Sequence, residues 1–246
     1  MAMRNLERLH ASVRADVEAY CARLLGALGA SVKAISAYGS ATGPDFIPKK
    51  SNINLVVVVG NLATGSLACI LDVVEMGKRR RIVPPLLVTP DYIKSSLDVF
   101  PIEYLDIRDS QVLLYGDDFF STIEVGRDYL RLECESQLRA AALRTRQGYL
   151  ELGAKRKGAE QVLHASVTSL IPVLKAMLRL KSAEIPLRKT EVVETVGKVF
   201  GADTKTFSAV LRDRSGDERI DGKNAHRVLA TYIDDVESLT GLLDQL

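Results

Sequence analysis

The chain has 246 residues, of which 47% are hydrophobic and 26% charged, a balance typical of a folded globular protein with a substantial core. Its 33 lysines and arginines stand against 31 aspartates and glutamates, which argues against a protein built mainly to coat nucleic acid. The three cysteines are widely spaced, and no run of about 18 apolar residues occurs. We therefore expect a reduced, cytoplasmic protein without a membrane span.

The first half of the chain alternates between helix and strand patterns. Apolar residues three and four positions apart predict a helix over 5–28, which Gly29 ends. The continuous apolar run at 53–59 is typical of a strand that is buried on both faces. The other elements predicted here are a strand at 31–37, a helix at 66–78, a strand at 86–89, a short helix opened by Pro90 and Asp91, and strands at 102–107 and 112–115.

After Gly116 the pattern changes to helices with few strand signals. The predicted helices span 126–152, 159–181, 191–200, 205–211 and 224–246, and Pro172 is expected to bend the second. The sequence therefore predicts two domains. An α+β domain with a mixed sheet flanked by helices covers 1–120, and an all-α helical bundle covers 121–246.

The most informative stretch couples a Gly-Ser turn to the start of the buried strand. Gly39 and Ser40 follow the first predicted strand, so their turn can offer backbone N–H groups and a hydroxyl to phosphate oxygens. After a gap of 11 residues, Asn52 and Asn54 stand two positions apart where the next strand begins. Side chains two apart on a strand share a face, so both are expected to point toward the turn.

This arrangement resembles the nucleotidyltransferase superfamily, and most closely its aminoglycoside and minimal bacterial members. Their pattern is a Gly-Ser or Gly-Gly turn, a short gap, and then Asp-x-Asp or Asp-x-Glu at the start of a buried strand, with a third carboxylate from a later strand. The resemblance covers 2–116, and an added helical domain is also usual in that group. It implies ATP or another nucleoside triphosphate at Gly39 and Ser40, Mg²⁺ beside it, a small-molecule or protein acceptor, and a homodimer, because related transferases often pair.

Asn52 and Asn54 depart from the pattern of the superfamily, where carboxylates stand at these metal-binding positions. In active members, those carboxylates hold two Mg²⁺ ions that bridge the triphosphate and activate the attacking hydroxyl. Magnesium prefers anionic oxygen ligands, and an amide oxygen is neutral. The missing charge should remove several kcal/mol of metal and transition-state stabilisation, and each ~1.4 kcal/mol is about tenfold in rate. The pattern predicts impaired catalysis.

Glu103 and Asp106 are the candidates for the third carboxylate of the superfamily. Both fall in the strand predicted at 102–107. Residues three apart on a regular strand face opposite sides, so only one of them could join the site. Glu103 is slightly preferred because it lies earlier on that strand. The alternative is that both are solvated acids at a strand end.

Positive charge is expected near the site from two segments. Lys49 and Lys50 lie in the loop before Asn52, where they either contact phosphate or remain solvated. The basic run from Lys78 to Arg81 is interpreted as a solvated helix end, which the helix dipole favours.

Three functions remain open from the sequence. The leading one is a nucleotidyltransferase-fold protein with impaired catalysis that binds a nucleotide or serves a regulatory role. The second is a working enzyme that moves a nucleoside monophosphate to an acceptor, with Glu103 or Asp106 anchoring a single metal ion. The third is an interaction module that binds a protein or RNA partner and no nucleotide.

Overall fold

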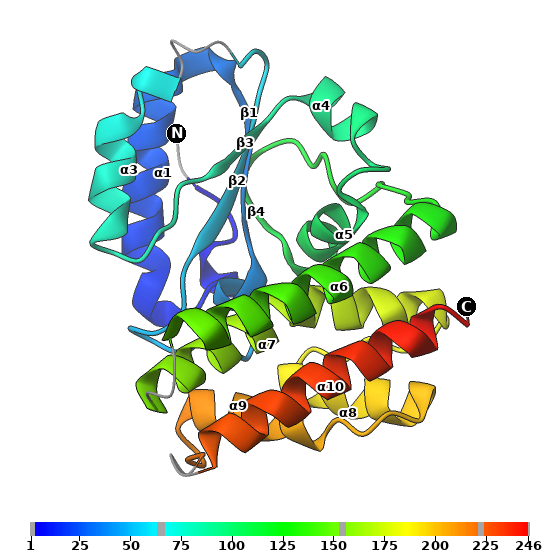
Figure 1. Cartoon of the computed structure of the whole chain (residues 1–246). Coiled ribbons are helices and arrows are strands. Elements are labelled where there is room, and N and C mark those ends of the chain that lie inside the picture. Colours follow the sequence, from blue (N-terminus) through cyan, green and yellow to red (C-terminus); the bar gives the residue numbers. More distant parts are fainter. Residues whose placement is uncertain (1–2, 63–66, 153–155, 221–223, 246) are drawn as a thin grey trace. The chain divides into compact units, whose positions relative to one another are not determined.

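Two structural units make up the chain, Met1–Val125 and Gly126–Leu246. The computed structural model describes residues 3–62, 67–152, 156–220 and 224–245. Within these residues, the first unit holds a sheet between helices and the second holds helices alone (Figure 1). The predicted class, an α+β domain followed by helices, is confirmed.

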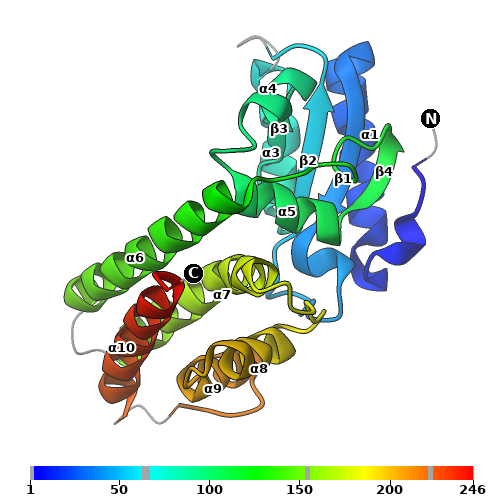
Figure 2. The ribbon, with the colours of Figure 1, turned by 90° about the vertical axis from the view of Figure 1, so that its right-hand side faces the viewer.

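The sheet has four strands in the order β3-β2-β1-β4 (Figure 2). They are β1 (Val32–Tyr38), β2 (Asn54–Val59), β3 (Leu86–Val88) and β4 (Val112–Gly116). Strand β1 pairs antiparallel with both β2 and β4, and β2 pairs parallel with β3. At one end of the first ladder Tyr38 is paired with Asn54. The start of β2 therefore lies beside the turn that follows β1.

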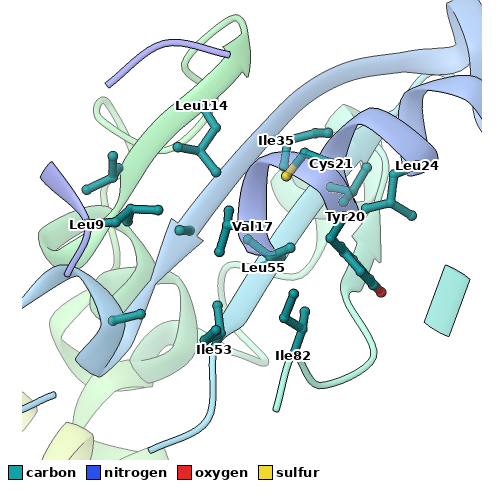
Figure 3. Packing of buried hydrophobic residues seen from close by; sticks show 14 of the residues in the cluster. Leu9, Val17, Tyr20, Cys21, Leu24, Ile35, Ile53, Leu55, Ile82 and Leu114 are labelled. Carbon is teal, nitrogen blue, oxygen red and sulfur yellow. The ribbon is translucent and has the colours of Figure 1, made fainter. Parts of the chain in front are cut away.

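Helices cover both faces of this sheet. On one face lie α1 (Arg14–Leu28) and α3 (Leu71–Lys78), and on the other lie α4 (Pro90–Ser95) and α5 (Pro101–Ser110) (Figure 1). Figure 3 shows the first core, in which residues of α1 pack with residues of the sheet. Strand β2 contributes to both cores: Leu55, Val57 and Val59 to the first, Val56 and Val58 to the second. This double burial explains its unbroken apolar run.

The strand predicted at 102–107 is wrong, because these residues belong to helix α5. Pro101 occupies the first turn of the helix, where its fixed φ and missing N–H are tolerated. Glu103 also lies in that turn, where an acid interacts favourably with the helix dipole. Tyr104 and Ile107 of α5 belong to the second core together with residues of β2. Tyr104 also packs edge-on against Phe100, and its hydroxyl lies 2.8 Å from the Ser96 hydroxyl.

Two other boundaries differ from the predicted elements. The helix expected over 5–28 begins with two short 3-10 turns, Leu6–Arg8 and Ala11–Val13, before α1. The helix expected over 66–78 starts in a segment, 63–66, that lies outside the described residues, and its regular part is α3.

The second unit consists of α6 (Arg127–Leu152), α7 (Arg156–Leu180), α8 (Lys189–Phe200), α9 (Lys205–Ser215) and α10 (Ala225–Leu243). Helix α7 is long and apolar enough over Gly158–Leu180 to cross a membrane by length and composition, with a mean hydropathy of 1.3. Half of the apolar 18-residue stretch within this segment is buried inside the protein, as in the core helix of a bundle.

A chain of hydroxyl groups joins three of these helices. Tyr232 of α10 donates to Ser166 of α7 at 3.0 Å, and Ser166 lies 3.1 Å from the hydroxyl of Thr145 in α6. Burial raises the pKa of the Tyr232 hydroxyl well above its usual value. Each buried hydroxyl is thus satisfied by another, which orients the three helices within the unit.

Gly116 provides a test of the sheet. Its φ is +76°, and a Cβ at this position would lie 1.8 Å from the carbonyl oxygen of Lys33. We expect Gly116→Ala to lower the free energy of unfolding by about 3 kcal/mol or more, because a backbone clash adds to the left-handed strain of about 1 kcal/mol. Urea unfolding measures this free energy. Gly201→Ala is the control, since its φ of +67° carries the strain but no atom lies within 4 Å. Equal losses in the two variants would contradict the close approach of β4 to β1.

Candidate functional site

The Gly-Ser turn is braced by the end of helix α5. Residues Gly39–Thr42 form a 3-10 turn directly after β1. The N–H of Gly39 donates to the Ser110 hydroxyl at 2.9 Å, and that hydroxyl donates to the Asp106 carbonyl oxygen at 2.7 Å. The Thr42 hydroxyl donates to the Gly39 carbonyl oxygen at 2.7 Å. Because the Gly39 N–H is already bonded, a phosphate at this turn would have to be bound by the other polar groups of the turn.

Asn54 lies against the Gly-Ser turn, as the spacing predicted. A Cβ built on Gly39 would be 3.0 Å from the Asn54 side-chain nitrogen, and Gly39 has a φ of +75°. Only glycine adopts that backbone conformation readily, and only glycine leaves space for the Asn54 side chain beside it. The first residue of β2 and the turn after β1 therefore share one location.

Asn52 has a different partner, Arg81. The Asn52 side-chain oxygen accepts a hydrogen bond of 3.1 Å from a terminal nitrogen of the Arg81 guanidinium. The same group donates to the carbonyl oxygens of Lys50 at 2.6 Å and Ser51 at 3.2 Å. Asn52 is exposed and precedes β2, whereas Asn54 is half-buried within it.

Arg81 is therefore not part of a solvated helix end. Helix α3 ends at Lys78, and Arg81 lies beyond it with a left-handed φ of +61°. Its carbonyl oxygen accepts from the Ile53 N–H at 2.9 Å, next to an isolated parallel bridge between Ile53 and Ile82. Backbone and side chain together hold Arg81 against the loop that precedes β2.

Lys49 and Lys50 lie in that same loop. Both are exposed, and Lys49 has a positive φ of +64°. The Lys50 carbonyl oxygen is one of the three acceptors of Arg81, so the backbone of the loop is held in place. A contact between either ammonium group and phosphate stays a prediction.

Glu103 and Asp106 lie on a helix, which changes what their spacing means. Residues three apart on a helix share a side, so the expectation that these two acids face opposite sides is wrong. Burial raises the pKa of the Tyr38 hydroxyl, and the negative charges of Asp106 and then of Glu103 raise it further. Both acids thus act electrostatically on the residue that is paired with Asn54. Their role as the third carboxylate stays a prediction.

A magnesium site of the superfamily type does not fit these residues. In the described part of the chain, no group of three or more His, Cys, Asp and Glu side chains could hold a metal ion. The later strands β3 and β4, with sequences LLV and VLLYG, carry no acid. The Asn52 oxygen that would face a cation instead accepts from the guanidinium, which is permanently charged.

Two residues of this site, Arg81 and Ser110, were not marked as site residues by the sequence. Arg81 was one of four successive basic residues, and nothing in the run marked it from the others. Ser110 reaches the turn through a tertiary contact, its hydrogen bond with the Gly39 N–H. Pro101, followed by Glu103, was the available signal that 101–110 is a helix and that its acids share a side.

Comparison with known proteins finds likeness in structure alone. No family model matches the chain, and no curated protein matches its sequence. Among solved structures, the chain is similar to spectinomycin adenyltransferase AAD(9) from Enterococcus faecialis, which was crystallised with ATP and spectinomycin. The TM-score is 0.62 at 12% identity, over 92% of this chain and 97% of that one. The chain therefore has a nucleotidyltransferase-like fold.

The electrostatic contact between α5 and β1 can be tested at Tyr38. We expect Asp106→Asn to lower the Tyr38 pKa, and Glu103→Gln to lower it less. In both variants the pKa should stay above the usual value of about 10, because burial remains. A pH titration by NMR of labelled tyrosine measures this, with Tyr38→Phe assigning the signal. An unchanged pKa in both variants would mean that neither acid acts on Tyr38.

Proposed function

We propose that this protein binds a nucleotide at the Gly39-Ser40 turn without transferring it, in a regulatory role. The observation that carries the proposal is the hydrogen bond from Arg81 to Asn52. It brings a fixed positive charge to Asn52, one of the two positions at which the superfamily carries metal-binding carboxylates. A site with this chemistry can attract phosphate but has lost the means to activate an acceptor hydroxyl.

The loss of transfer follows from charge. Two-metal catalysis needs anionic ligands that hold both ions in place as charge develops on the attacking and leaving oxygens. Asn52 and Asn54 offer neutral amides, and β3 and β4 offer no carboxylate. Losing even one preorganised electrostatic contact in a transition state costs about 10²–10³ in rate. The combined changes put nucleotide transfer out of useful range.

Retention of nucleotide binding is supported by the turn itself. Gly39 keeps the backbone conformation that brings the turn onto Asn54, and Ser110 holds it there. Arg81 and the two loop lysines add positive charge near the start of β2. The structurally similar adenyltransferase was crystallised with ATP, which makes ATP the first nucleotide to test.

We place the protein in the cytoplasm, where nucleoside triphosphates are plentiful. Its three cysteines are free, with Cys21 and Cys134 buried and Cys69 exposed. Free thiols suit a reducing compartment.

The proposal predicts no transfer of label from Mg-ATP to small hydroxyl or amino acceptors. The assay uses α-labelled ATP, a panel of acceptors including aminoglycosides, and an active adenyltransferase as positive control. Robust transfer of label from ATP that disappears in the Ser40→Ala variant would contradict the proposal. If the same transfer also disappeared in Asp106→Asn, a working enzyme with α5 carboxylates would be the better assignment.

Restoring the carboxylates tests whether the site geometry survives. We expect the Asn52→Asp, Asn54→Asp variant to bind Mn²⁺ weakly, because the new carboxylate at position 52 would form an ion pair with Arg81. Adding Arg81→Gln should strengthen Mn²⁺ binding about tenfold by removing that cation. Mn²⁺ titration followed by proton relaxation measures both, with the parent chain as blank. Equal binding by the double and triple variants would contradict the assigned position of Arg81.

A further inference from the structure

We infer that Arg81 replaces the divalent cation of this site, so that the ligand is a nucleoside triphosphate free of metal. The inference rests on the proposed function and specifies it. In related enzymes the triphosphate arrives as a magnesium complex, and the protein contributes negative charge to hold the ion. Here the protein contributes the cation itself and no carboxylate at positions 52 and 54.

The guanidinium is anchored and still accessible. Its Nε donates to Ser51, and one terminal nitrogen donates to Lys50 and Asn52. Among the described residues, none is bonded to the second terminal nitrogen, which has two N–H groups. The Arg81 side chain is exposed, so those groups can reach a ligand. The remaining N–H groups lie in the guanidinium plane and share its charge, so each can donate a charge-assisted hydrogen bond to a phosphate oxygen.

The backbone of Arg81 adds to this preorganisation. The carbonyl oxygen of Arg81 accepts from Ile53, so the residue is held at the N-terminal end of β2. Its left-handed φ of +61° is uncommon for arginine. An arginine held by backbone and side chain loses less conformational entropy on binding than a solvated one.

The asparagines fit a metal-free phosphate better than aspartates would. An amide has N–H donors, whereas a carboxylate only accepts hydrogen bonds and repels phosphate. Because the Asn52 oxygen accepts from Arg81, its amide nitrogen is left to donate elsewhere. The Asn54 nitrogen lies next to Gly39, at the turn. Asn52 therefore orients the guanidinium without cancelling its charge, whereas a carboxylate at this position would cancel it.

Magnesium should compete with this binding mode. The ion would neutralise part of the triphosphate charge that Arg81 attracts, and it would find no carboxylate at Asn52 or Asn54 in return. The rival explanation is that Arg81 only holds the 49–52 loop in place. That role would make binding independent of the guanidinium charge.

The experiment measures binding of a fluorescent ATP analogue in excess EDTA and again in excess Mg²⁺. We expect binding in EDTA, weakened several-fold by Mg²⁺. In EDTA, Arg81→Gln should bind the ATP analogue about tenfold more weakly or worse, because losing one charge-assisted hydrogen bond has an effect of this size. Arg79→Gln is the matched control, because it removes the same charge from the same basic run, and should bind as the parent does. Adenosine should bind far more weakly than ATP.

The outcomes distinguish a failure of the proposed function from a failure of this inference. No binding in either buffer overturns the proposed function. Binding that requires Mg²⁺ overturns this inference and leaves nucleotide binding standing. Unchanged affinity in Arg81→Gln also overturns it, since the arginine would then only support the loop. If Arg81→Gln fails to fold, the Asn52→Asp variant serves as the test. The new carboxylate keeps the hydrogen bond to Arg81 and cancels the charge of the guanidinium, so the affinity for ATP in EDTA should fall. Retained affinity would refute the inference.

Discussion

The antiparallel pairing of β1 with β2 is the constraint on which the candidate site depends. By pairing Tyr38 with Asn54, it puts the turn after β1 next to the start of β2. The apolar residues of β2 contribute to the cores on both faces of the sheet, so this register is strongly specified. A slip of one residue would move Asn54 to the other face and separate it from Gly39. The site is thus a consequence of how the sheet buries valine and leucine.

Around this pairing, side-chain hydrogen bonds hold the turn after β1 and the loop before β2 in place. Ser110 bonds the Gly39 N–H, and Arg81 bonds Asn52 and the loop before it. Under the proposed function, the charge of the site is reversed relative to a magnesium centre: Arg81 supplies the cation, and positions 52 and 54 carry no carboxylate. Binding and catalysis respond differently to such a change. In that proposal a guanidinium still attracts phosphate, whereas an acceptor hydroxyl has no metal ion to help it lose its proton.

Apolar periodicity predicted most of the architecture, because it reports directly on burial. It found β1, β2 and β4 and the helices of the second unit to within a few residues. It failed at 102–107, where Ile102 and Tyr104 alternate as on a strand, although Ile107 breaks that alternation. Pro101 was the stronger signal there. The error mattered for the site, since on a helix Glu103 and Asp106 share a side, and both influence Tyr38.

The sequence by itself determined the Gly-Ser turn, the buried strand that follows it, and the absence of carboxylates at positions 52 and 54. These are local properties, because a backbone turn and the charge of a side chain depend on residue type. Only the tertiary structure decided which of four successive basic residues meets Asn52, a contact across 29 positions of the chain. It also decided that Ser110, 71 positions from Gly39, holds the turn. Such partners are chosen by strand register and helix packing, which no local pattern encodes.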